Sequence, residues 1–268
     1  MSIQDYLKVK QFPLFTCSGC THGTVTNAFA RVADELKLDK DKTVVVCAIG
    51  CAGRIPTFLD FNVARVTHGR ALAFATGIKL SRPDMKVIVI MGDGDALAIG
   101  GNHFIHAARR NIDISAIVCR NEIYGMTGGQ YAPTTPVGAF ATTAPYGMLE
   151  PSFDTCKVAE GAGATFVARS DTYHVTHLHQ MLKKVIQHKG FGVLEVLTSC
   201  PTQFGRRNKM ADPIKMLERI KDVTVMKERA NKMTPEELQG KFVIGEFVNT
   251  SRPELTEVYA QAFAKMEG

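Results

Sequence analysis

The stretch KVIVIMGDGD, residues 86–95, decides the fold class of this 268-residue chain. Its first half is a continuous apolar run without polar alternation, which is typical of a strand buried on both faces of a parallel sheet. Its second half places two glycines and two carboxylates where such a strand ends. Ligands of open α/β sheets bind at the carboxyl ends of the strands. The stretch therefore predicts a buried parallel strand that leads into a binding loop.

Other parts of the chain repeat this pattern of apolar runs separated by helix-like segments. Strand-like runs lie at residues 43–50, 114–121 and 191–198. Helical patterns lie at residues 21–37, 68–81, 101–110 and 175–189. Alternation of this kind predicts an α/β fold with a doubly wound parallel sheet.

Two segments depart from the alternation. Residues 124–148 are rich in Gly, Thr and Pro, and loops of this length in compact domains are usually functional or disordered. After residue 210 the chain turns to charged helical pieces with few core-like runs. We expect residues 1–210 to form the α/β domain and residues 211–268 to form a C-terminal extension that packs on a partner subunit.

Composition narrows the class of protein. The chain is 45% hydrophobic and 22% charged, and no apolar run approaches the roughly 18 residues of a membrane span. Without an apolar leader segment, a cytoplasmic location is expected. The net charge is +6, but the chain has no aromatic–basic motif, so we expect no nucleic-acid partner. An acidic partner protein suits this charge equally well.

Polar residues follow two apolar runs that are expected to be neighbouring strands. Asp93 follows the run 86–92, and Asn121 ends the next strand-like run. Carboxylate and amide oxygens suit Mg²⁺, which completes its shell with phosphate oxygens and water. Gly92 and Gly94 allow a tight turn and the close approach of a phosphate. A simple chain reversal at GDG is the alternative, and the asparagine after the next strand favours the metal–diphosphate site.

Cysteines gather at the same predicted edge of the sheet. The stretch TCSGCTHG, residues 16–23, contains Cys17 and Cys20 two residues apart, and Cys51 and Cys200 each follow a predicted strand. In a reducing compartment, seven cysteines favour metal or redox chemistry over disulfides. Spacing alone leaves zinc and an iron–sulfur cluster both open for these four thiolates. Two further cysteines inside predicted strands are expected in the core, Cys47 and Cys119.

Four longer sequence segments carry a family resemblance: IGCAGR (49–54), THGRALAFATG (67–77), GDGDALAIGGNHFIHAARRN (92–111) and NEIYGMTGGQYAPTTP (121–136). From about residue 12 to 210, the chain resembles the β subunit of the 2-oxoacid:ferredoxin oxidoreductases, which are thiamine diphosphate enzymes. The stretch LAIGGNHFIHAARRN is most similar to the 2-oxoglutarate branch of that family. The resemblance implies a thiamine diphosphate-binding α/β domain.

The resemblance also assigns ligands. It implies that Mg²⁺ is bound by the side chains of Asp93 and Asn121 and by the carbonyl oxygen of Ile123, with Gly94 and Asp95 along the diphosphate. It implies that a [4Fe–4S] cluster is held by Cys17, Cys20, Cys51 and Cys200. The remaining residues expected around the cofactor are Gly50, Cys51, Gly92, Gly125 and Thr127.

Three residues are predicted to act near the substrate. The guanidinium of Arg54 could pair with the distal carboxylate of a dicarboxylic 2-oxoacid, or it could pair with an acidic residue of a partner subunit. His68 is expected to donate or accept a hydrogen bond at the cofactor or substrate, the alternative being a core histidine. The resemblance places Met126 over the thiazolium ring, where it would shape the pocket.

The predicted reaction joins these groups. A 2-oxoacid, coenzyme A and oxidised ferredoxin would give acyl-CoA, CO₂ and reduced ferredoxin, or the reverse carboxylation. 2-Oxoglutarate is the expected substrate, and pyruvate or a broader range of 2-oxoacids is the alternative. A zinc-stapled binding subunit without catalysis is the alternative from another class.

The resemblance implies that the activating glutamate comes from an α subunit, in a dimer of heterodimers. This chain alone is then expected to be inactive. Ferredoxin is expected to dock on a basic cluster just after Cys200, formed by Arg206, Arg207 and Lys209.

Overall fold

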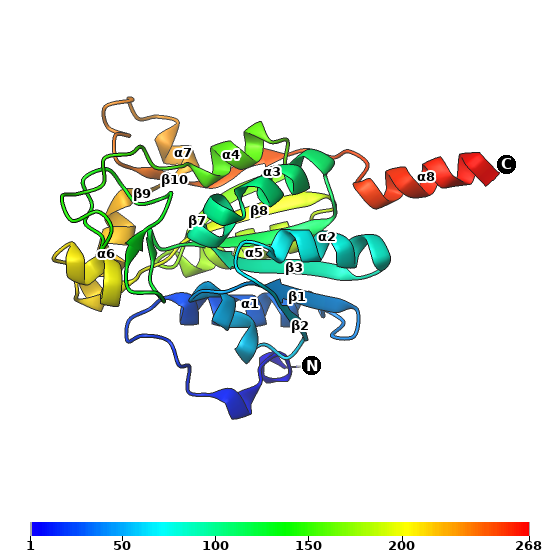
Figure 1. Cartoon of the computed structure of the whole chain (residues 1–268), viewed down its shortest axis with the longest axis horizontal. Helices are drawn as coiled ribbons and strands as arrows, with labels where there is room; N and C mark the ends of the chain where they lie inside the picture. The colour runs from blue at the N-terminus through cyan, green and yellow to red at the C-terminus, as the bar shows by residue number, and fades with distance from the viewer. Residues whose placement is uncertain (1, 268) are drawn as a thin grey trace.

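An eight-stranded sheet forms the centre of the molecule (Figure 1). The computed structural model describes residues 2–267. The strand order is β2-β1-β3-β4-β8-β7-β10-β9, and every pairing is parallel apart from β10 against β7. The strands are β1 (Thr43–Cys47), β2 (Asn62–Arg65), β3 (Lys86–Gly92), β4 (Ile114–Arg120), β7 (Phe166–Asp171), β8 (Phe191–Leu197), β9 (Thr224–Met226) and β10 (Phe242–Asn249).

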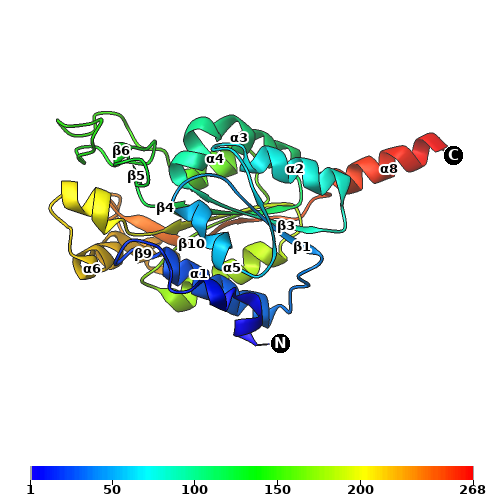
Figure 2. The same ribbon diagram turned by 60° about the horizontal axis from the view of Figure 1, so that its bottom comes forward.

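Helices cover both faces of this sheet, as Figure 2 shows. Helices α1 (His22–Glu35) and α5 (Val175–Gln187) lie on one face. Helices α2 (Ala71–Ser81), α3 (Gly101–Arg110) and α4 (Thr155–Gly161) lie on the other. The doubly wound α/β prediction is confirmed.

Strand β3 lacks polar alternation because it contributes to two cores. Ile88 and Ile90 pack under α1 and α5, whereas Val87, Val89 and Met91 pack under α2 and α3. Successive side chains of a strand point to opposite faces, so a strand covered on both sides needs apolar residues throughout.

The chain after residue 210 is only partly separate from the sheet. Helix α6 (Pro213–Val223) and the short helix α7 (Lys227–Ala230) flank β9, and β10 pairs with β7. The expected boundary at 210 therefore does not mark the edge of the sheet, which gains two strands from beyond it. The last helix, α8 (Leu255–Glu267), does project away from the body (Figures 1 and 2).

Short elements connect the layers and form the loops at the carboxyl edge. Strands β5 (Ile123–Tyr124) and β6 (Gln130–Tyr131) make a hairpin at the start of the long predicted loop. Short helical segments are η1 (Ile3–Tyr6), η2 (Val9–Gln11), η3 (Ala52–Phe58), η4 (Asp95–Ile99) and η5 (Pro201–Gly205). None of the described helices combines the length and apolarity that a membrane span requires.

Candidate active site

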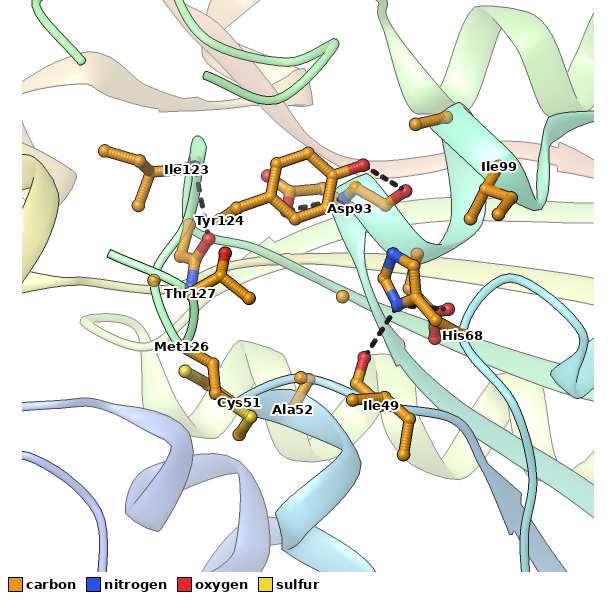
Figure 3. A pocket seen from close by; sticks show the side chains of 17 residues that line it. Ile49, Cys51, Ala52, His68, Asp93, Ile99, Ile123, Tyr124, Met126 and Thr127 are labelled. Atoms are coloured by element: carbon orange, nitrogen blue, oxygen red, sulfur yellow. Dashed lines mark hydrogen bonds and ion pairs between the residues drawn. The ribbon is translucent and has the colours of Figure 1, made fainter. Parts of the chain in front are cut away.

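A cavity of about 510 Å³, here called the Asp93 cavity, opens at the carboxyl ends of β1, β3 and β4 (Figure 3). Its walls come from the loops that follow these adjacent strands and from the turn before α2. The predicted site residues that line it are Gly50, Cys51, His68, Gly92, Asp93, Gly94, Asp95, Asn121, Ile123, Gly125, Met126 and Thr127.

Asp93 and Asn121 meet in this cavity because β3 and β4 are paired neighbours. Burial raises the pKa of Asp93, and hydrogen bonds from Thr134 and from the amide of Glu122 oppose that rise. The amide oxygen of Asn121 accepts a hydrogen bond of 3.3 Å from the backbone N–H of Ile123. A buried carboxylate and an amide oxygen beside each other form a donor set that suits Mg²⁺.

Gly94 is required at the turn because Tyr124 closes over it. A Cβ at Gly94 would lie 2.5 Å from the Tyr124 ring, and the Tyr124 hydroxyl donates a 3.0 Å hydrogen bond to the Gly94 carbonyl. Figure 3 draws the ring in front of Asp93. The glycine therefore permits close packing of the hairpin on the turn.

His68 points into the cavity with a fixed ring orientation (Figure 3). Its Nδ1 lies 2.9 Å from the carbonyl oxygen of Ile49 and 3.2 Å from Oδ1 of Asp95. Both partners are acceptors, so Nδ1 carries the proton, and in the neutral ring Nε2 is the acceptor. His68 is half-exposed and is not a core histidine.

The Asp95 carboxylate is committed to this histidine and to the backbone. It accepts a hydrogen bond from the N–H of Gly69, and burial raises its pKa to about 6, against the opposing effects of Gly69 and His68. A carboxylate facing a diphosphate would be repelled by it, so any contact of Asp95 with a diphosphate would use its backbone.

A second cavity of about 550 Å³, the thiol cavity, adjoins the first and shares Cys51, Asn121, Gly125 and Met126 with it. The four cysteines singled out from the sequence come from separate parts of the chain and all line it. A Cβ at Gly125 would lie 3.4 Å from the Cys200 sulfur and 3.5 Å from the Cys51 sulfur. The backbone at Gly125 is therefore the wall between the two cavities.

The thiols of this cavity are all free. Burial raises the pKa of Cys20 to about 12 and that of Cys51 to about 11, and the neighbouring cysteines add to both rises because their thiolates repel one another. Four cysteine sulfurs around one cavity are a donor set that an iron–sulfur cluster or a zinc ion takes. The other cysteines, Cys47, Cys119 and Cys156, are buried and do not line this cavity.

Arg54 stands at the thiol cavity and is exposed. Its guanidinium lies over the ring of Phe15, at 5.0 Å, and pairs with no acidic side chain among the described residues. Met126 borders both cavities. Thr127 lines only the Asp93 cavity, and its hydroxyl donates a 2.6 Å hydrogen bond to the Gln130 side chain.

Comparisons with known proteins agree with this geometry. Residues 40–196 match the family model for the C-terminal TPP-binding domain of thiamine pyrophosphate enzymes. The "2-oxoglutarate synthase subunit KorB" of Methanocaldococcus jannaschii is 47% identical over 262 residues, covering 98% of this chain and 97% of the relative. The chain belongs to the KorB family of 2-oxoacid:ferredoxin oxidoreductase β subunits.

Two further proteins are similar to this KorB-family chain. The "2-oxoacid:ferredoxin oxidoreductase subunit beta" of Saccharolobus solfataricus is 44% identical over 69% of this chain and 62% of its own. A solved 2-oxoglutarate:ferredoxin oxidoreductase from Magnetococcus marinus, with 2-oxoglutarate, coenzyme A and succinyl-CoA bound, superposes with a TM-score of 0.89 at 31% identity. That match covers all of this chain and 91% of the other. The KorB-family chain is thus an oxidoreductase subunit built on a thiamine diphosphate-binding domain.

Sequence reasoning did not identify Tyr124 or Thr134 as residues of the site in this KorB-family chain. Tyr124 covers the GDG turn, and Thr134 is fully buried with its hydroxyl on Asp93. Both lie in the long loop, where no periodicity marks which side chains turn inward. The threonines and prolines of this loop are ordinary loop residues, so its composition gives no signal either.

Proposed function

We propose that this chain is the cofactor- and cluster-bearing β subunit of a 2-oxoglutarate:ferredoxin oxidoreductase. The reaction converts 2-oxoglutarate and coenzyme A into succinyl-CoA and CO₂, releasing two electrons and one proton. Ferredoxin takes up the electrons one at a time, and the reverse carboxylation uses the same groups. The names of the relatives support 2-oxoglutarate as the substrate.

The observation that carries this proposal is the shared wall between the two cavities. Asn121, Gly125 and Met126 border both the metal-ligand side and the thiol side. Electron transfer is fast only between groups that lie close together, so a redox cluster is useful beside the cofactor, whereas a structural zinc site could lie anywhere.

The Asp93 cavity has the donors that thiamine diphosphate with Mg²⁺ needs. Asp93 and Asn121 would bind the metal through their side chains and Ile123 through its carbonyl. The open space beside Gly92 would admit the diphosphate, which Gly94 would contact through its backbone. The bound cofactor supplies a carbon nucleophile that holds the electron pair left when CO₂ departs. Met126 would exclude water from the reacting carbon, and Nε2 of His68 would accept a hydrogen bond at the cofactor or substrate.

The thiol cavity has the donors for a [4Fe–4S] cluster, which accepts and releases single electrons. Cys17, Cys20, Cys51 and Cys200 would be its ligands. Zinc satisfies the same four thiolates and is the alternative from another class. A reducing, cytoplasmic setting is part of the proposal because it keeps these thiols available.

Arg54 favours a dicarboxylic substrate. Its guanidinium lies at the cavities and has no acidic partner among the described residues, so the distal carboxylate of 2-oxoglutarate would find a free bidentate donor. Pyruvate lacks that carboxylate, so an enzyme for pyruvate or for many 2-oxoacids would gain little from this arginine.

An α subunit would complete the site. No glutamate is among the described residues that line the Asp93 cavity, so the residue that activates the aminopyrimidine ring would come from a partner chain. We expect a dimer of heterodimers. Helix α8, which carries the exposed side chains of Tyr259, Phe263 and Met266, is the proposed contact with that partner.

Anaerobic co-expression with the α subunit tests the proposal. The purified complex is expected to be brown, to absorb broadly near 400 nm, and to hold about four iron and four sulfide per chain. It should reduce ferredoxin with 2-oxoglutarate only when coenzyme A, thiamine diphosphate and Mg²⁺ are present. Colourless protein with stoichiometric zinc would overturn the cluster, and preference for pyruvate would overturn the substrate.

A further inference from the structure

The Asp93 carboxylate is held by three hydrogen bonds from the protein. Its Oδ1 accepts a 2.9 Å bond from the N–H of Gly94. Its Oδ2 accepts a 2.8 Å bond from the N–H of Glu122 and a 2.5 Å bond from the hydroxyl of Thr134. The side chain is 2% exposed, so water has almost no access to it.

These three donors leave one place on the carboxylate for a metal. The two oxygens of a carboxylate offer about four lone-pair positions, and two on Oδ2 and one on Oδ1 are taken. The remaining position is on Oδ1. A metal in the Asp93 cavity would therefore bind through Oδ1 alone, to a carboxylate whose orientation the three hydrogen bonds already fix.

Thr134 has no freedom to turn away from this role. Its side chain is fully buried, and its backbone carbonyl accepts a 2.9 Å hydrogen bond from Nη2 of Arg120. The next residue, Thr135, donates a 2.6 Å hydrogen bond to the carbonyl of Glu122. The long loop is thus fastened to the ends of β3 and β4 by two adjacent threonines.

Glu122 supplies the second donor because of its unusual backbone. Its φ of 64° lies in the left-handed region, which non-glycine residues rarely adopt. The Glu122 carboxylate accepts a 2.8 Å ion-paired hydrogen bond from Arg219 of α6, and it is buried. This contact anchors the conformation that directs the Glu122 N–H at Asp93.

We propose that Thr134 is a positioning residue for the metal: its hydroxyl fixes Asp93 so that Oδ1 alone faces Mg²⁺. This inference rests on the proposed magnesium–diphosphate site and assigns the long loop a part in assembling it. Partners of metal ligands commonly change metal affinity by about 10- to 100-fold when removed. Thr134 touches neither the substrate nor the cofactor in this arrangement.

The test compares hydroxyl-free and hydroxyl-bearing variants in the assembled α/β enzyme after removal of metal with EDTA. The apparent Mg²⁺ dissociation constant is measured by titration calorimetry at saturating thiamine diphosphate. Thr134→Val is expected to raise this constant about tenfold or more, whereas Thr134→Ser is expected to remain within about threefold of wild type. Thr165→Val is the matched control, because it removes another buried threonine hydroxyl, one bonded to Asn111.

Each outcome decides the inference. Unchanged Mg²⁺ affinity in Thr134→Val, weak affinity in Thr134→Ser, or an equal loss in Thr165→Val would overturn it. Thr134→Ala removes the hydroxyl and leaves space, and it is expected to match Thr134→Val. Failure of both hydroxyl-free variants to assemble would assign Thr134 to folding instead. If wild type itself binds thiamine diphosphate without needing Mg²⁺, the proposed site fails rather than the role of Thr134.

Discussion

Arg54 lies at the thiol cavity with its guanidinium over the ring of Phe15. The aromatic face orients the cation without neutralising it, so the guanidinium keeps its hydrogen-bonding capacity for a carboxylate. Hydrogen bonds to charged groups contribute about 1.5–3 kcal/mol. Arg54→Gln is therefore expected to lower kcat/KM for 2-oxoglutarate roughly 10- to 100-fold and to change that for pyruvate much less.

Steady-state kinetics of the assembled enzyme with both acids would measure this difference. Arg65→Gln is the matched control: Arg65 lies on β2, outside both cavities, and donates a 2.7 Å hydrogen bond to the hydroxyl of Thr57. An equal loss of kcat/KM for the two acids would mean that Arg54 does not bind the distal carboxylate.

The sequence predicted the position of a residue where a strand end determined that position. Asp93, Asn121 and Cys200 each follow a buried parallel strand, and parallel strands bring such residues to one edge. The direction of the Asp95 side chain was not predictable, because it depends on where Gly69 and His68 lie in space. Contacts made within an aperiodic loop leave no pattern in the sequence.

The central strands share a buried ionic cluster that depends on three elements at once. Glu195 of β8 is fully buried and pairs with Arg169 of β7 and Arg120 of β4. Burial raises the pKa of Glu195, but the two guanidinium groups and the Thr155 hydroxyl outweigh it and hold the pKa below its ordinary value of 4.5. The ionised form is thus favoured in the folded chain.

Replacing this carboxylate should cost stability in a pH-dependent way. Glu195→Gln leaves two buried cations underpaired and is expected to lower the free energy of unfolding by about 3–5 kcal/mol at pH 7. A lowered pKa stabilises the fold above the unfolded value of about 4.5 and loses that effect as the pH falls through the folded value. The gap between wild type and variant should therefore narrow below pH 4.5.

Urea unfolding at a series of pH values measures both effects. Glu218→Gln is the control, since Glu218 is exposed on α6 and makes no ion pair among the described residues. A gap that stays constant down to pH 3 would show that the charge on Glu195 is not the cause.

Strand β10 marks the limit of sequence reasoning about elements. Its residues FVIGEFVN include a glutamate and a glycine and lie between charged segments, so the run did not stand out as a strand. It pairs antiparallel with β7 and is only partly buried. A strand near the edge of a sheet needs less apolar character than a central one, and its signal is correspondingly weaker.

Helix α8 offers an element whose function is separable from the fold. Its start is fixed by Glu254, which accepts hydrogen bonds from the N–H groups of Thr256 and Glu257, and by Leu255 against the core. Beyond that turn the helix leaves the body (Figure 1). Deleting residues 258–268 is therefore expected to leave thermal unfolding of the isolated chain nearly unchanged and to weaken binding of the α subunit at least tenfold.

Surface plasmon resonance against the immobilised α subunit would measure that loss. Phe263→Ser with Met266→Ser tests the apolar contact alone, and Lys265→Ser is the control for a polar residue of the same helix. Undiminished binding by the truncated chain would exclude α8 from the interface.

Across the whole molecule, charge and topology together bear on where the proposed ferredoxin partner would dock. The predicted basic cluster follows η5, whose residues line the thiol cavity. Arg206 and Lys209 are exposed, but Arg207 is not free, since it donates hydrogen bonds to Gln203 and to the carbonyl of Gly128. The surface available to an acidic partner is therefore Arg206 and Lys209, and Arg207 fastens the long loop.

The double variant Arg206→Gln, Lys209→Gln should raise KM for ferredoxin severalfold at low ionic strength, because rim charges act mainly on the association rate. The difference should fade above about 0.5 M salt, where the Debye length is only a few ångströms. Reduction of methyl viologen should stay unchanged, since a small acceptor needs no docking surface.

A matched change of charge at the opposite edge of the sheet distinguishes a local docking surface from an effect of the overall net charge on KM for ferredoxin. Arg109 and Arg110 are exposed at the end of α3, where the chain returns to the amino end of β4. Their double glutamine variant removes the same two charges from the +6 total and is expected to leave KM for ferredoxin unchanged. If both double variants raise KM equally, ferredoxin responds to the overall charge of the molecule, and electrons leave by another surface.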